Sequence, residues 1–135
     1  MKHGLALDID ETLSASNIFW FESLSRLFGN PENLFPLEIA EKYRYTDHVP
    51  YWQSDEAIAW LDSARKSNEI HVNMPLIENA HNIVQKINEI IPIVAYITAR
   101  PHAVIEGTKN WLDKHNFPKA ELITRPESFG FRGGG

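Results

Sequence analysis

The sequence contains no cysteine, which excludes a disulfide framework and a thiolate metal site. It also has no excess of basic residues. The net charge of -5 leads us to expect no binding to a nucleic-acid polymer or to an anionic membrane. No apolar run approaches the length of a membrane span. The residues from Met1 to His3 lead directly into an apolar segment without room for a signal peptide, so we expect a cytoplasmic protein.

The length and composition of the chain suit one ordinary domain. The chain has 135 residues, of which 43% are hydrophobic, and this is enough to bury a sizeable core. Its histidines show no paired spacing of metal ligands, so we interpret them as surface or core residues and not as a zinc site. They are His3, His48, His71, His81, His102 and His115.

The segment from Leu5 to Leu13 begins as an apolar run and ends in two carboxylates, Asp8 and Asp10, followed by the hydroxyl of Thr12. Its first residues suit a buried parallel strand, whose alternation would put both carboxylates on one side. Two such carboxylates repel each other and need a cation or a shared proton. Ligands bind at the carboxyl edge of open α/β sheets. An acidic turn after a strand is the alternative, but the apolar strand and the D-x-D-x-T-L continuation favour a chemical site.

The string Asp8-Ile9-Asp10-Glu11-Thr12-Leu13 resembles the first motif of the haloacid dehalogenase (HAD) superfamily, whose members are mostly magnesium-dependent phosphatases. The resemblance implies that Asp8 is the nucleophile that forms an aspartyl-phosphate. It implies that Asp10 protonates the leaving oxygen and then activates water. It also implies a Mg²⁺ cofactor held by Asp8 and Asp10, the latter through its backbone carbonyl, and it includes Thr12 among the phosphate-binding residues. A carboxylate at Asp10 favours phosphoryl transfer over cleavage of a carbon–halogen bond.

Residues 14–70 show helical patterns and no strand pattern, so we expect a helical insertion between two parts of an α/β core, residues 1–13 and 71–135. The expected helices run from a cap at Ser16 or Asn17 to Phe28, from Pro36 to about Tyr43, and onward from Ser54-Asp55-Glu56.

Most of the aromatic residues lie in this insertion, and most of them are expected to form its core, because short helices need large side chains to bury enough area. They are Phe19, Trp20, Phe21, Phe28, Phe35, Tyr43, Tyr45, Tyr51, Trp52 and Trp60. The HAD resemblance implies a C1-type cap at this place in the chain, which covers the active site and selects the substrate. Phe19 or Trp20 could then stack on a substrate ring.

The second half of the chain alternates between helical and strand patterns, which is typical of a parallel Rossmann-like sheet. The pattern predicts a helix from Pro75 to Ile90, a strand from Ile93 to Ile97, a helix after Pro101 that turns Val104 or Ile105, Thr108, Trp111 and Leu112 inward, and a strand from Leu122 to Pro126.

A hydroxyl and a cation follow the second of these strands. Thr98 matches the second HAD motif, a Ser or Thr that hydrogen-bonds the transferring phosphoryl group, so we include it among the catalytic residues. The backbone amide of Ala99 could add an anion-binding donor. Arg100 is either a phosphate ligand or a residue that forms a salt bridge on the surface.

The segment from Pro75 to Pro126, with its strings ITARP at 97–101 and LITRP at 122–126, resembles the 5'(3')-deoxyribonucleotidase-type branch of the superfamily, which pairs a small helical cap with this core. The resemblance as a whole covers roughly residues 5 to 126. The sequence departs from the family at its end. The Lys of the third motif and the acidic pair of the fourth are expected after Arg125, but residues 129–135 do not supply them, and Lys109, Lys114 and Lys119 precede the third strand.

Two functions from different classes follow. The first is a Mg²⁺-dependent phosphatase for a small phosphorylated substrate, which could be a nucleotide. The second is a catalytically incomplete module that binds phosphate or a nucleotide. The missing motifs also lead us to expect either a truncated core or a homo-oligomer in which another copy pairs with an open sheet edge.

Overall fold

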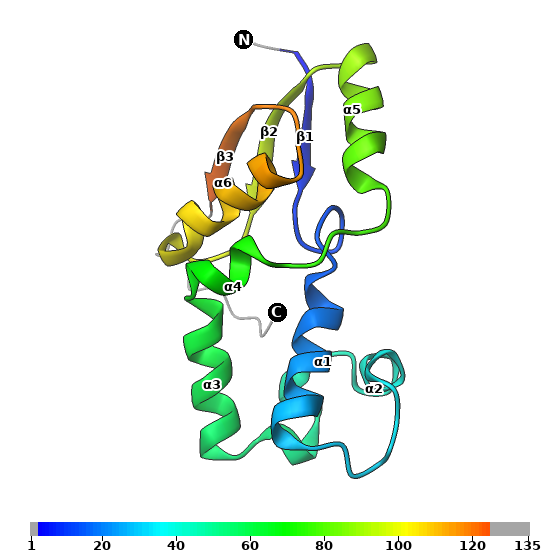
Figure 1. The fold of residues 1–135 in the computed structure, drawn as a ribbon, viewed down its shortest axis with the longest axis vertical. Coiled ribbons are helices and arrows are strands. Elements are labelled where there is room, and N and C mark those ends of the chain that lie inside the picture. The colour runs from blue at the N-terminus through cyan, green and yellow to red at the C-terminus, as the bar shows by residue number, and fades with distance from the viewer. Residues whose placement is uncertain (1–2, 125–135) are drawn as a thin grey trace.

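The computed structural model describes residues 3–124 and shows an α/β protein with a small parallel sheet and six α-helices in that range (Figure 1). The strands are β1 (Leu5–Asp8), β2 (Ile93–Thr98) and β3 (Glu121–Thr124). The α-helices are α1 (Ser16–Phe28), α2 (Pro36–Tyr43), α3 (Asp55–Arg65), α4 (Asn68–Val72), α5 (Ala80–Ile90) and α6 (Ile105–Lys114). Three short 3-10 helices are η1 (Thr46–His48), η2 (Pro50–Trp52) and η3 (His102–Val104).

The three strands lie in the order β1-β2-β3, so β1 forms one edge of the sheet in the described part of the chain. Leu7 pairs with Tyr96, and Tyr96 pairs with Leu122, which puts these three side chains on one face. Helices α5 and α6 contribute to the hydrophobic cluster on that face. Ile97 and Ile123, which pair with each other on the opposite face, remain exposed.

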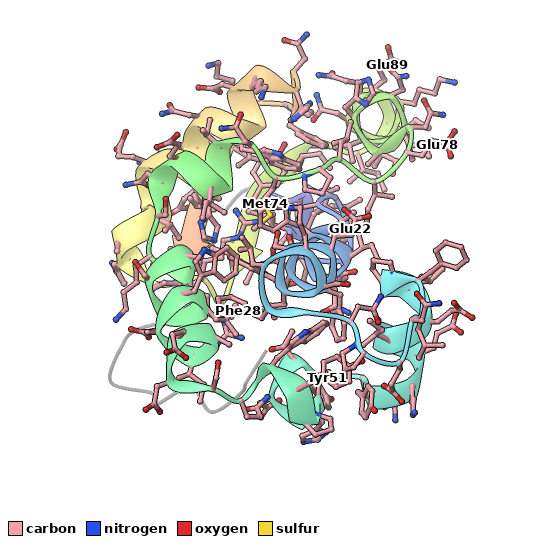
Figure 2. The ribbon with its side chains drawn as sticks, turned by 60° about the horizontal axis from the view of Figure 1, so that its bottom comes forward. Glu22, Phe28, Tyr51, Met74, Glu78 and Glu89 are labelled. Atoms are coloured by element: carbon pink, nitrogen blue, oxygen red, sulfur yellow. The ribbon has the colours of Figure 1, made fainter. Side chains whose placement is uncertain are left out.

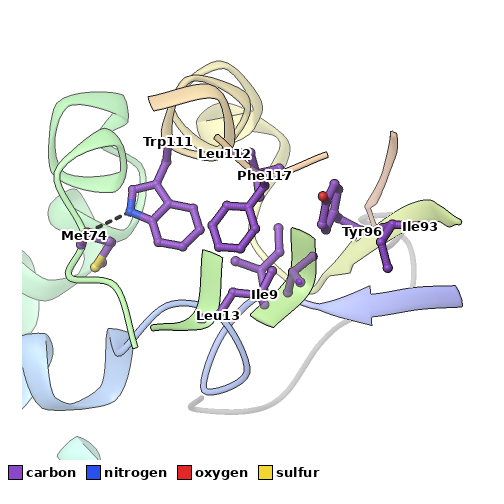
Figure 3. Packing of buried hydrophobic residues seen from close by; sticks show 10 residues of the cluster. Ile9, Leu13, Met74, Ile93, Tyr96, Trp111, Leu112 and Phe117 are labelled. Carbon is purple, nitrogen blue, oxygen red and sulfur yellow. Dashed lines mark hydrogen bonds between the residues drawn. The ribbon is translucent and has the colours of Figure 1, made fainter. Parts of the chain in front are cut away.

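The cluster between the sheet and the helices contains the buried Trp111, stacked on Phe117 with a ring distance of 5.4 Å (Figure 3). Both polar aromatic side chains of the cluster have partners: Trp111 Nε1 donates to the Met74 carbonyl at 2.7 Å, and the Tyr96 hydroxyl donates to the Pro118 carbonyl at 2.6 Å. These bonds satisfy polar groups whose burial would otherwise be destabilising. The first joins α6 to the segment between α4 and α5, and the second joins β2 to the chain after α6.

The insertion has its own core, formed by Phe21, Leu24, Ile39, Val49 and Trp52. Its helices form the lower half of the molecule in Figure 1, and Figure 2 shows Phe28 and Tyr51 within this half. Most of the aromatic residues of the insertion are at least partly buried, as predicted, and the exposed exceptions are Phe35 and Tyr45. This local core explains how a stretch of short helices folds without a strand of its own.

The predicted helix from Pro75 was wrong at its start, because α5 begins at Ala80. The segment before it pairs with the chain that enters the insertion. The Ile77 amide donates to the Leu13 carbonyl at 2.8 Å, and Ser14 forms an antiparallel bridge with Leu76. Backbone groups used in this pairing are not free for helical bonds, so the helix starts later. The short α4 was not predicted.

The predicted cap of the first helix was also wrong. Neither Ser16 nor Asn17 caps α1 with its side chain; its N-cap residue is Ala15. The Glu11 carboxylate instead accepts a hydrogen bond from the Asn17 amide at 2.5 Å. Ser16 donates to Asp10, so its hydroxyl serves another partner.

The remaining predicted elements lie close to their predicted positions. Ser54 caps α3, and its side chain accepts from the Ala57 amide at 3.1 Å. The third strand is confirmed as far as Thr124, whereas Arg125 and Pro126 lie outside the described residues. Within residues 3–124, no helix is long and apolar enough to cross a membrane.

Candidate functional site

The carboxyl ends of the three parallel strands bring predicted site residues to one edge of the sheet. Asp8, the last residue of β1, pairs with Ile97, and the next residue of β2 is Thr98, which pairs with Thr124. Asp8 is exposed, whereas Thr98 is buried. An exposed carboxylate at this edge is accessible to a ligand.

The loop after β1 folds back tightly over Ile9. The Ile9 carbonyl accepts from the amides of Thr12, Leu13 and Ser14 at 3.3, 2.8 and 3.0 Å, and Glu11 has a left-handed φ of 63°. Thr12 is exposed in this loop, which leaves its side chain accessible. The turn therefore separates Asp8 in the strand from the residues that enter α1.

In the loop after β2, the Thr98 side chain forms a hydrogen bond with the backbone two residues later. Thr98 Oγ1 accepts a hydrogen bond from the Arg100 amide at 3.0 Å, and Ala99 between them is exposed. A phosphoryl group would therefore have to share the Thr98 hydroxyl with this internal bond. The Arg100 amide is already used, while the Ala99 backbone is still a candidate donor.

Arg100 joins Asp10 in an ion pair, so its surroundings match neither of the two alternatives from the sequence. Arg100 Nη2 lies 2.7 Å from Asp10 Oδ1, and Nε lies 3.2 Å from each of the two carboxylate oxygens. The Arg100 side chain is 5% exposed and that of Asp10 is 38% exposed. The guanidinium is thus an interior partner of Asp10, not a surface charge, and it is not free to bind a ligand in this arrangement.

Several hydroxyl groups complete this network, and no pattern in the sequence indicates their role. Ser16 donates to Asp10 Oδ1 at 2.5 Å and lies 2.7 Å from the Ser14 hydroxyl. Thr108 accepts from Arg100 Nη1 at 3.1 Å and donates to the Val104 carbonyl. We name Asp10, Ser14, Ser16, Arg100 and Thr108 the Asp10–Arg100 network. Through Ser16 and Thr108, the network connects the start of α1 to α6.

The network determines the charge state of Asp10. Burial by itself raises the pKa of Asp10, but the hydrogen bonds and charge of Arg100 and the hydrogen bond from Ser16 outweigh it and hold the pKa below its ordinary value. The nearby His71 has a lowered pKa, chiefly because it is buried, and its Nδ1 donates to the Ser67 carbonyl at 2.7 Å. Asp10 is therefore ionised, with a neutral imidazole nearby, at neutral pH.

The donors at this edge partly suit the Mg²⁺ that the sequence predicts. The exposed Asp8 carboxylate and the Asp10 backbone carbonyl are hard oxygen donors, and Mg²⁺ keeps several waters, so these two groups could hold it. The Asp10 carboxylate is already neutralised by Arg100. Among residues 3–124, no group of three or more His, Cys, Asp or Glu side chains is arranged to hold a metal ion, so a third acidic ligand is not found there.

A hollow in the insertion has a different lining from this edge. It has a volume of about 290 Å³, and its lining includes Leu24, Trp52 and Arg65 of the insertion. None of the predicted site residues lines it.

Phe19 and Trp20 pack edge-to-face at a ring distance of 5.1 Å, and Trp20 also lies 6.0 Å from the His71 ring. These contacts account for both aromatic side chains as packing residues.

Comparison with known proteins gave no match among family models, curated proteins or solved structures.

Proposed function

We propose that this protein is a Mg²⁺-dependent phosphomonoester hydrolase of the HAD type with Asp8 as its nucleophile. The observation that supports this most is the exposed Asp8 carboxylate at the carboxyl end of β1, one strand away from Thr98 at the end of β2. A carboxylate in this position can attack the phosphorus atom of a phosphomonoester and displace the ester oxygen with its alcohol, which forms an aspartyl-phosphate. Water then hydrolyses this intermediate, releases phosphate and regenerates the carboxylate.

The role of Asp10 follows from its ion pair. An ionised carboxylate can accept a proton from water in the second step, because it starts without one. Protonating a leaving alkoxide in the first step would require a proton that the Asp10–Arg100 network disfavours. The arrangement therefore suits a substrate whose leaving group needs little protonation, such as a phenolate, better than an alkyl phosphate. A bound Mg²⁺ would supply charge stabilisation to the phosphoryl oxygens.

In the same proposal, residues 14–70 are the C1-type cap of a Rossmann-like HAD core, and the substrate is a small phosphomonoester. A nucleotide, whose leaving group is an alkoxide, would then be hydrolysed more slowly than an aryl phosphate. The separate hydrophobic core of the insertion supports its role as a unit that covers the site. Ser14 and Leu76 pair with each other where the chain enters and leaves the insertion, which gives a cap a defined attachment.

A second candidate is a phosphate- or nucleotide-binding module that does not turn over. Two observations favour it. The Asp10 carboxylate is paired with Arg100, and residues 3–124 contain no group of three or more His, Cys, Asp or Glu side chains that could hold a metal ion. In this case Asp8 and the loop after β2 would bind the phosphate without covalent chemistry.

Hydrolysis of p-nitrophenyl phosphate with Mg²⁺, beside a panel of nucleotides, tests the two candidates. The phosphatase proposal predicts turnover that Asp8→Asn abolishes and that the exposed-carboxylate control Asp113→Asn retains. It also predicts a larger rate with the phenyl ester than with an alkyl phosphate. Binding without turnover would favour the module, and unchanged turnover in Asp8→Asn would refute Asp8 as the nucleophile.

A further inference from the structure

The hollow in the insertion has the size and the lining of a small-molecule site. Its volume of about 290 Å³ is at the lower end of ligand pockets in proteins, which span roughly 300–1,000 Å³. Every described residue that lines it lies between positions 24 and 65, in or next to α1, η1, η2 and α3. Helices α1 and α3 belong to the lower half of the molecule in Figure 1. The hollow therefore belongs to the insertion alone.

Apolar side chains form much of its wall. Leu24 of α1 and Trp52 of η2 are almost fully buried, and Leu61 of α3 is partly buried. The Trp52 indole N–H already donates to the Gly29 carbonyl at 2.9 Å, so Trp52 offers a ligand its ring and not a hydrogen bond. An indole ring attracts both apolar groups and cations. This wall suits a ligand with an apolar body.

The polar groups of the lining are mainly hydrogen-bond acceptors. Asp47 and Asp62 contribute carboxylates. Gln53 Nε2 donates to the carbonyls of Thr46 and Val49 at 3.0 and 2.9 Å, so both of its amide hydrogens are used and its side-chain oxygen is left as an acceptor. A ligand that satisfies this lining must donate hydrogen bonds.

A buried hydroxyl in the lining points independently to a ligand. Thr46 is only 6% exposed, and within residues 3–124 its hydroxyl has no hydrogen-bond partner. In the same range, the side-chain atom that is both without a partner and sealed from solvent is His81 Nδ1, so the Thr46 hydroxyl is still reachable. Buried hydroxyls are normally bonded, because leaving one unpaired is unfavourable. A ligand in the hollow that Thr46 lines would supply the partner.

The charges of the lining favour a cation. Two carboxylates, Asp47 and Asp62, face one guanidinium, that of Arg65. Burial lowers the pKa of Arg65, and the charges of both carboxylates act against this change, so both are near it. One guanidinium cannot neutralise two carboxylates. Lys66 lies 3.4 Å from Asp62, but both side chains are so exposed that this pair is weak.

We propose that the hollow binds a small organic ammonium ion with an apolar body, such as an arylalkylamine. The ammonium group would donate to the Asp47 carboxylate and to the adjacent Thr46 hydroxyl, and the charge of Asp62 would add to its attraction. The apolar body would lie against Trp52 and Leu61. The proposal does not depend on the chemistry at Asp8.

Titration of the 135-residue chain with 2-phenylethylamine, followed by ¹H–¹⁵N NMR, tests the proposal. We expect saturable binding with a dissociation constant of about 1 mM or lower, as suits so small a ligand. The signals that shift should include the amides of Thr46, Asp47 and Gln53 and the indole N–H of Trp52. The uncharged 2-phenylethanol, which has the same ring, should bind at least about tenfold more weakly, and the anionic phenylacetate more weakly still.

Two substitutions separate binding from folding. Asp47→Asn removes a charge at an exposed position and should raise the dissociation constant at least about fivefold. Thr46→Val removes the hydroxyl with little change of shape and should raise it about three- to tenfold. Its melting temperature, followed by circular dichroism, should stay the same or rise, because no hydrogen bond of that hydroxyl is lost within residues 3–124. Asp113→Asn, at an exposed carboxylate of α6, is the control and should bind like the wild type.

The absence of saturable binding at about 10 mM amine, ten times the expected constant, would overturn the proposal. Phenylacetate that binds as tightly as the amine would also overturn it, because the positive charge of Arg65 would then dominate recognition. Unchanged binding by Asp47→Asn would do the same, and it decides the test if Thr46→Val fails to fold. A folded Thr46→Val protein that binds the amine like the wild type would contradict the role of the hydroxyl.

Discussion

Two ion pairs in this molecule join segments that are apart in the chain, and they differ mainly in how far the cation is exposed to water. In the α/β region, Arg100 bonds to Asp10 with a side chain that is almost fully buried. In the insertion, Lys42 bonds to Glu32; the Lys42 side chain is 52% exposed and the Glu32 side chain is partly exposed, like that of Asp10. The Glu32 carboxylate also accepts from the hydroxyls of Tyr43 at 2.7 Å and Tyr51 at 2.9 Å. Similar chemistry thus occurs in two different surroundings.

The comparison shows that a lowered pKa does not by itself indicate a strong contribution to stability. The hydrogen bonds from Lys42 and Tyr43 lower the pKa of Glu32 to about 2, and those of Arg100 and Ser16 lower the pKa of Asp10 against the effect of burial. Water and salt screen the exposed pair, whereas the buried guanidinium has no alternative partner of similar strength. We therefore expect large effects from the Asp10–Arg100 network and small ones around Glu32.

The largest effect on stability is expected from Arg100→Met. It leaves the Asp10 carboxylate without its cation and should lower the free energy of unfolding by about 2–4 kcal/mol, somewhat below a fully buried pair because Asp10 is partly exposed. Urea denaturation at pH 7 measures this, with Arg26→Met, at an exposed position of α1, as the control. A loss of unfolding free energy no larger than that of Arg26→Met would contradict the claim that the Asp10–Arg100 pair contributes more to stability than the Glu32–Lys42 pair.

The same variant should change the response to acid. In the wild type the pKa of Asp10 is lowered, so its contribution to stability is present above its ordinary value near 4 and is lost as the pH falls through the folded-state pKa. In Arg100→Met, protonation removes the unpaired charge. The stability difference between the two proteins should therefore shrink between pH 7 and about pH 3. A difference that stays constant or grows over this range would argue against an ion pair at Asp10.

A smaller effect is expected from Ser16→Ala. The variant removes one hydrogen bond to a charged group and should cost about 1–3 kcal/mol. Ser63→Ala, on the exposed side of α3, is the matched control and should have little effect. If both variants behave alike, the Ser16 hydroxyl is not part of the network.

The smallest effect is expected from Glu32→Gln. Its contribution is present above the ordinary pKa of a glutamate and is lost as the pH falls toward about 2, and it is screened because the group lies at the surface. Urea denaturation at pH 7 should show a small difference from the wild type that disappears in about 1 M NaCl. A loss as large as that of Arg100→Met, or one that resists salt, would remove the distinction between the two pairs.

The sequence predicted the elements that depend on local signals. Alternating and helical hydrophobic patterns located β2, α1 and α2, and the cap at Ser54 located the start of α3. The start of α5 could not be predicted, because it depends on pairing between residues 13–14 and 76–77, which no local pattern encodes.

The candidate site was less predictable than the fold. The D-x-D string located Asp8 and Asp10, but an arginine after a strand can equally bind a ligand, lie at the surface or pair inside. Only the arrangement of β1, β2 and α6 in space shows that Arg100 reaches Asp10. The sequence predicts Ser16 or Asn17 as the cap of the first helix because such residues before a helix usually cap it, but the Ser16 hydroxyl bonds to the nearby carboxylate of Asp10 instead.

Trapping of the phosphoenzyme tests the central claim, nucleophilic catalysis by Asp8, most directly. The chain would be quenched in acid during turnover of p-nitrophenyl phosphate with Mg²⁺, and its peptides would be analysed by mass spectrometry. We predict one phosphoryl group on the carboxylate of Asp8 and none in the Asp8→Asn variant. Turnover with the phosphoryl group on another residue, or turnover that persists in Asp8→Asn, would contradict the account.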